Sequence, residues 1–193
     1  MAVTRNREDT IAAFEALAIP LEKQVYHVCL NMMGNREDAE DCAQETMLKA
    51  FRGFARFEGR SKFSTWLYSI ATNVCLDALR TRRDAVSLEV LQEAGWEVAD
   101  EAPEAYERLE AAERRRLLKA ALKELPPDFK AALTLVDLQG LPYQEAAEAL
   151  ELPLGTVKSR VSRARNQLLV ILSRQPELFG QNPRHNGERR EKR

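Results

Sequence analysis

The stretch PYQEAAEALELPLGTVKSRVSRARNQLL, residues 142–169, decides the fold of the C-terminal part of this chain. It predicts a short helix, a tight turn and a second helix. Pro142 suits a helix start, and small alanines in the first helix allow the second helix to cross it closely. Glu151 falls in the turn, where glycine would more easily adopt a left-handed conformation. Apolar residues at helical spacing form the buried stripes of the two helices: Ala146, Ala147, Leu150, Val157, Val161, Ala164 and Leu168.

The second of these helices is strongly basic. Residues 154–174 hold five Lys or Arg and no acid. A short apolar helix followed by a basic one is typical of a helix-turn-helix that places its second helix in the major groove of DNA. Lys and Arg donate to guanine edges, Ser bonds either way, and a phosphate could approach the N–H groups at the helix start. The candidate DNA-binding residues are Thr156, Lys158, Ser159, Arg160, Ser162, Arg163 and Arg165.

The rest of the chain also predicts helices, because apolar residues recur at helical spacing and strand-like alternation is absent. We expect a helix or helix pair over 9–33, a helix over 36–55, a loop over 57–63, and then the most regular helix of the chain. Further helices are expected at about 104–124 and 128–138. The fold class is therefore all-α.

The regular helix that follows residue 63 carries a second basic, aromatic surface. Residues 56–83 hold six basic residues against two acidic ones. Trp66 is expected to pack into the core, whereas Tyr68 and Asn73 are expected to face outward. Ser69 and Arg80 lie on the same polar face, and Arg60 lies in the preceding loop.

The net charge of −1 hides a basic–acidic–basic pattern, because residues 84–103 hold six acids and no Lys or Arg. This pattern predicts two small helical domains, 8–83 and 104–174, joined by an acidic linker over 84–103 and followed by a mobile tail over 175–193. The linker could fold on the two basic domains in the free protein and mask both DNA surfaces.

Several classes of function are disfavoured by the sequence. A Gly-rich phosphate loop and a metal-ligand cluster are both absent, so we expect no enzyme, no metal and no cofactor. Cys29, Cys42 and Cys75 are interpreted as buried reduced thiols. No apolar run is long enough to span a membrane, and the N-terminus lacks the apolar core of a signal peptide, so we expect a cytoplasmic protein.

Three segments together resemble the sigma-70 family, specifically its small extracytoplasmic-function (ECF) sigma factors. LPLGTVKSRVSRARNQL is similar to the recognition helix of their region 4. EDAEDCAQETMLKAF and FSTWLYSIATNVCLDALRTRR are similar to their region 2. The resemblance covers roughly residues 10–170. It implies a factor that directs core RNA polymerase to promoters and helps to open the −10 element.

The resemblance also implies roles for single residues. Asp41, Gln44, Glu45, Thr46 and Lys49 match the helix that docks on the clamp of core polymerase. Lys62, Trp66, Tyr68 and Asn73 match the part that opens the −10 element and holds an unstacked base, a role that aromatic and amide side chains suit. The basic helix matches the −35 reader. The implied partners are the clamp and flap of core RNA polymerase, promoter DNA and an anti-sigma factor, with the protein nucleoid-associated when bound to polymerase.

The alternative is a stand-alone helix-turn-helix repressor or activator. That reading explains residues 104–174 but not the second basic, aromatic surface or the acidic linker. The two readings differ in a simple test, because a sigma factor should need core polymerase to footprint DNA and a repressor should not.

Overall fold

The computed structural model describes residues 2–85 and 105–174, and all the regular structure in these ranges is helical. The all-α prediction is confirmed. The linker over 84–103 lies almost wholly outside the described residues, as does the tail over 175–193.

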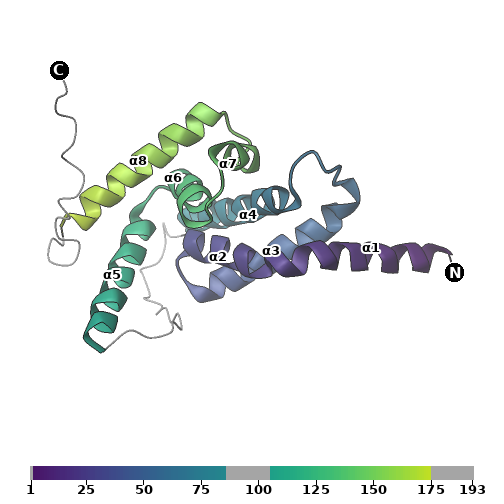
Figure 1. Ribbon diagram of the computed structural model, residues 1–193, viewed down its shortest axis with the longest axis horizontal. Helices are drawn as coiled ribbons and strands as arrows, with labels where there is room; N and C mark the ends of the chain where they lie inside the picture. Colours follow the sequence, from purple (N-terminus) through teal and green to yellow (C-terminus); the bar gives the residue numbers. More distant parts are fainter. Residues whose placement is uncertain (1, 86–104, 175–193) are drawn as a thin grey trace, which may run out of the picture.

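The N-terminal half consists of four α-helices and two short 3-10 turns (Figure 1). The expected helix pair over 9–33 begins earlier than predicted and is interrupted at Pro20, where proline removes a backbone donor. Asn35 caps α3 by accepting from the backbone N–H of Asp38 at 3.0 Å. The elements are α1 (Ala2–Ala18), η1 (Ile19–Leu21), α2 (Glu22–Met33), α3 (Arg36–Gly53), η2 (Phe54–Arg56) and α4 (Phe63–Ala85).

The C-terminal half consists of α5 (Ala105–Glu124), α6 (Pro127–Leu133), a π-helical turn η3 (Thr134–Leu138), α7 (Tyr143–Ala149) and α8 (Leu154–Leu172). The helix-turn-helix is confirmed as α7 and α8. Glu151 in its turn has a φ of 53°, so the expected left-handed residue is present. Val157, Val161 and Ala164 form the buried stripe of α8.

Helix α4 lies between the two halves. It packs against α2 and α3, and it also packs against α6 and α7 (Figure 1). Buried residues of both halves form one continuous hydrophobic core. The two halves therefore contact each other directly.

The three cysteines lie within this core, one on each of α2, α3 and α4. Cys29, Cys42 and Cys75 are buried free thiols, as the sequence predicted. Cys75 is in hydrogen-bond contact with the other two thiols, and these contacts, together with burial, raise its pKa far above the usual range. The cluster ties together the three helices of the N-terminal half.

Candidate nucleic-acid interface

Helix α8 presents an open basic face. Successive helical residues turn by about 100°, so Lys158, Ser159, Ser162 and Arg163 fall on one arc opposite the buried stripe. All four are exposed. The Ser159 hydroxyl donates to the carbonyl of Thr156 at 2.9 Å, while Lys158 and Arg163 have no ion-pair partner within the described parts of the chain. This arc is free to meet a DNA groove.

The other two arginines of α8 flank the buried stripe and bind acids of their own domain. Arg165 forms a bidentate pair with Asp137 of η3, at 2.6 and 2.8 Å, and this hydrogen bonding raises the pKa of Arg165. Arg160 approaches Asp128 of α6 at 3.3 Å. Both pairs hold α8 onto the elements beneath it, so these two arginines are engaged in a structural contact.

A groove runs between α3 and α4 and contains two of the predicted −10 residues. Trp66 and Asn73 line it together with Lys49, Arg56 and Ile70, and its volume is about 390 Å³, within the range of small-molecule pockets. The Trp66 ring is half-buried and stacks obliquely on Phe57, with centroids 4.9 Å apart. The groove therefore offers an aromatic surface, an exposed amide and two cations near one another.

The expectation that Tyr68 faces outward is wrong. Tyr68 is only 6% exposed, and burial raises its pKa. Thr65 and Thr72, on the same side of α4, are buried as well. The reason is that α6 and α7 cover this side of α4, which an isolated helix would expose. Of the predicted outward face, Asn73 and Arg80 are exposed and Ser69 is half-buried.

The predicted docking residues share one face of α3, with one exception. Asp41, Gln44 and Lys49 are exposed and Glu45 is half-buried. Thr46 is instead fully buried, and its hydroxyl donates to the carbonyl of Cys42 at 2.6 Å. Thr46 therefore cannot contact polymerase in this conformation, and its role is to pack α3 against the core.

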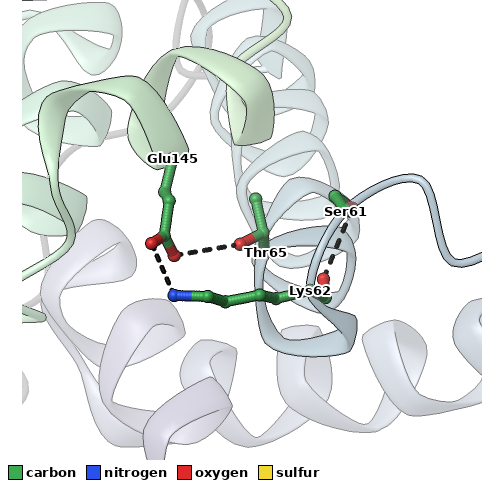
Figure 2. A network of polar contacts seen from close by, with 4 residues as sticks. All are labelled: Ser61, Lys62, Thr65 and Glu145. Carbon is green, nitrogen blue, oxygen red and sulfur yellow. Dashed lines mark hydrogen bonds and ion pairs between the residues drawn. The ribbon is translucent and has the colours of Figure 1, made fainter.

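The predicted −10 residue Lys62 makes a contact that the sequence did not suggest. Its ammonium binds Glu145 of α7 at 2.6 Å, and the Thr65 hydroxyl donates to the other carboxylate oxygen at 3.4 Å (Figure 2). The Ser61 hydroxyl donates to the carbonyl of Lys62 at 3.4 Å. Arg60, nearby in the loop, pairs with Glu58 at 2.5 Å. The Glu145 contact joins the two predicted DNA-binding halves.

A second polar contact between the halves lies at the C-terminal end of α2. Lys130 of α6 is 5% exposed and donates to the carbonyl of Met32 at 3.4 Å. Burial, and after it the charge of Lys123, lower its pKa to about 8. Lys123 itself lies over Gly34, the left-handed residue that ends α2.

Sequence reasoning missed four residues of these surfaces. Glu145 and Lys130 were missed because their partners lie far away in the chain. Leu48 is 51% exposed and lies centrally among the docking residues, and an apolar residue at helical spacing is ordinarily assigned to a core. Asn166 is exposed on the open arc of α8 and could have been found from that spacing alone.

Within the described ranges, no cluster of His, Cys, Asp or Glu is arranged to hold a metal ion. Among the helices in the same ranges, none has the length and apolar character needed to cross a bilayer.

Comparison with known proteins gives consistent matches. The sigma-70 region 2 model matches residues 19–85, and the sigma-70 region 4 model matches residues 115–168. The ECF RNA polymerase sigma factor SigE of Mycolicibacterium smegmatis is 38% identical over 151 residues, which cover 78% of this chain and 58% of that relative. The RNA polymerase sigma-H factor of Pseudomonas aeruginosa is 34% identical over 172 residues, covering 86% of this chain and 89% of that relative. A solved structure of the sigma factor RpoE with the anti-sigma factor NepR, from Bartonella quintana, is similar with a TM-score of 0.68 and 26% identity, covering 83% of this chain and 97% of that chain.

Proposed function

The chain belongs to the sigma-70 family as an ECF sigma factor, and from this premise we propose how its residues divide the work of promoter recognition. The observation that carries the proposal is the presence of two separate nucleic-acid surfaces. One is the open basic arc of α8, and the other is the groove between α3 and α4 that contains Trp66 and Asn73. The sigma factor directs core RNA polymerase to promoters through both.

In this proposal, the arc of α8 reads the −35 element in the major groove. Lys158 and Arg163 donate to guanine edges, and Ser159 and Ser162 bond either way. Thr156 at the helix start approaches a phosphate. Arg160 and Arg165 hold the helix in place, a division that their pairs with Asp128 and Asp137 support.

The groove of α4 acts on the −10 element. A base that leaves the duplex stacks on Trp66 and bonds the amide of Asn73, and Arg56 neutralises a neighbouring phosphate. Arg60, Lys62, Ser69 and Arg80 extend this surface. Tyr68 joins it only in a conformation in which its side of α4 is uncovered.

The polymerase-docking surface is the outer face of α3, with Asp41, Gln44, Glu45 and Lys49 around Leu48. The C-terminal half, 104–174, engages the flap, and 8–83 engages the clamp. We propose that the protein acts in the cytoplasm, where polymerase and DNA meet. Regulation by an anti-sigma factor, in an envelope or stress response, is supported by the similarity to the RpoE–NepR structure. A stand-alone repressor is disfavoured, because it leaves the region 2 match over 19–85 unexplained.

The test is transcription in vitro from a promoter library with core polymerase. We expect run-off transcripts that require both the chain and the core enzyme, and no footprint by the chain alone. Asn73→Ala should keep the closed complex but reduce permanganate reactivity of thymines near −10, because a lost hydrogen-bond contact to a base edge is worth about 1–3 kcal/mol. A pre-melted template should rescue this variant. Wild-type reactivity of Asn73→Ala would remove Asn73 from the opening step.

A further inference from the structure

Glu145 occupies a site whose chemistry suits a phosphate. One carboxylate oxygen accepts from the Lys62 ammonium and the other accepts from the Thr65 hydroxyl (Figure 2). A DNA phosphate also presents charged acceptor oxygens, and Lys and Thr donors are common phosphate contacts. The site lies at the start of α4, next to the groove that holds Trp66 and Asn73. Glu145 therefore stands where the backbone of a −10 strand could pass.

The contact is built to be exchangeable. The Lys62 side chain is 70% exposed, so water and salt screen the pair and its strength alone is small. A longer polyanion can replace the carboxylate, because a DNA strand brings several phosphates to the surrounding cations at once. In the buried part of the interface, Lys130 donates to the Met32 carbonyl, so this part of the interface encloses a cation.

The packed conformation cannot serve both promoter elements. Helix α8 packs on α7 and α7 packs on α4, with about 8–10 Å between the axes of packed helices. Asn73 lies about 17 Å along the helix from Lys62, so the two DNA surfaces lie close together in the packed conformation. The −35 and −10 elements lie about 25 base pairs apart, or about 85 Å at about 3.4 Å per base pair. Fully extended, the twenty residues of 84–103 reach about 66 Å, so this connection is long enough to let the two halves separate.

We propose that Glu145 is an intramolecular latch that occupies the phosphate site of Lys62 and Thr65 in the free chain, and that a single-stranded DNA backbone displaces it. This inference rests on the proposed function. It differs from masking by the acidic linker, because the masking group belongs to the helix-turn-helix itself. It is also one-sided, since the reading arc of α8 stays exposed while Thr65 and the Tyr68 side of α4 are buried and the Lys62 ammonium is paired with Glu145.

A zero-length cross-link tests whether the latch is closed. A water-soluble carbodiimide activates a carboxylate, the amine attacks it, and an amide forms as the urea leaves. With Lys62 and Glu145 in direct contact, we expect a Lys62–Glu145 amide in peptide mass spectra of the full-length free chain. The yield should fall at least several-fold in the holoenzyme with core polymerase. Absence of this cross-link from the free chain, or equal yield in the holoenzyme, would overturn the latch.

Matched charge removals test whether the latch competes with DNA. Glu145→Gln and Glu148→Gln each remove one charge from α7, but Glu148 is exposed and has no side-chain partner within the described parts of the chain. The probe is a short mixed-sequence single-stranded oligonucleotide, followed by fluorescence anisotropy with the full-length chain. We expect Glu145→Gln to bind about 3- to 10-fold more tightly than Glu148→Gln. Equal affinities would overturn the competition.

The holoenzyme separates this inference from the proposed function. Once core polymerase has opened the chain, Glu145→Gln and Glu148→Gln should transcribe alike. If wild type and both variants fail to support transcription with core polymerase, the proposed function fails. If they all transcribe but the free chains neither cross-link nor differ in oligonucleotide binding, only the latch fails.

Discussion

At the scale of single residues, the four cations of α8 between Lys158 and Arg165 divide into two pairs. Lys158 and Arg163 lie on the open arc, whereas Arg160 and Arg165 border the buried stripe and bind Asp128 and Asp137. The spacing of a helix separates these pairs by position, because a turn of about 100° per residue places them on different sides of the same cylinder. Four cations of the same helix therefore have different roles: two are open to DNA and two hold the helix in place.

This division predicts opposite results for two kinds of substitution. Lys158→Ala and Arg163→Ala should each weaken discrimination of the −35 sequence by about 1–3 kcal/mol per lost base contact, with unchanged thermal stability. Arg165→Ala should leave discrimination intact and reduce stability by less than about 1 kcal/mol, since its pair is half-exposed. Competition binding of the holoenzyme to −35 variants, with thermal unfolding alongside, gives both readouts. Loss of discrimination in Arg165→Ala alone would reverse the assignment.

Gly34 lies at a position where adding a single Cβ atom should reduce stability. It has a φ of 75°, and an added Cβ would lie 2.9 Å from Cε of Lys123 in the other half of the molecule. Gly34→Ala should destabilise the protein by about 1–2 kcal/mol through the left-handed backbone, and displacement of Lys123 should add to this.

Gly59→Ala is the matched control, because Gly59 has a φ of 68° with open space around it. Urea unfolding gives the loss of unfolding free energy in each variant. The extra loss in Gly34→Ala over Gly59→Ala reports the cost of displacing Lys123. If the two lose equal stability, the Lys123 side chain moves aside without penalty.

At the scale of elements, the helices were predictable because an amphipathic helix repeats its pattern many times. Helices α3, α4 and α5 lie close to the predicted ranges. The exposure of α4 was only partly predictable. A helical pattern identifies the apolar side, but the polar side of α4 is covered by α6 and α7, and Thr65 finds its partner in Glu145, eighty residues away. The buried tyrosine at 68 follows from that long-range contact, which no local pattern encodes.

Helix α3 carries a prediction for polymerase docking. Leu48 is 51% exposed at the centre of the polar face that holds Asp41, Gln44 and Glu45. Protein interfaces concentrate their binding energy in a central, desolvated patch, so Leu48→Asp should weaken core polymerase binding by at least about 2 kcal/mol. Stability should change little.

Leu17→Asp provides the control for general loss of apolar surface, since Leu17 is 45% exposed on α1. Affinity for core polymerase, measured by fluorescence titration, should distinguish the two. Similar losses for both variants would indicate that no defined docking face exists on α3.

At the scale of the whole molecule, the packing of the two halves encloses a charge. Lys130 is 5% exposed, and its ammonium lies beside the C-terminal end of α2, where helix carbonyls favour a cation. Lys123 faces it with a like charge. The result is a cation that is partly compensated and a pKa of about 8 instead of 10.5.

This lowered pKa predicts how stability depends on pH. The unfolded or opened chain binds the Lys130 proton more tightly than the packed chain, so packing is penalised while the group is charged. The penalty is fully present below pH 8 and falls as the pH rises toward 10.5. The difference between a pKa of about 8 in the packed chain and 10.5 in the unfolded chain corresponds to a loss of about 3 kcal/mol in stability at neutral pH. Lys130→Met keeps an unbranched side chain of similar length and removes the charge.

We therefore expect Lys130→Met to be more stable than wild type at pH 7, with an advantage that shrinks steadily between pH 8 and 10.5. Other groups also affect stability at high pH, among them Tyr68, whose raised pKa has the opposite effect because its stabilising contribution is lost at high pH. These groups contribute equally to the unfolding free energies of the two proteins. The difference between those free energies, measured by urea unfolding at each pH, therefore reports Lys130 alone. A difference that stays constant with pH would mean that Lys130 titrates as an exposed lysine does, and that the interface between the halves admits water at this point.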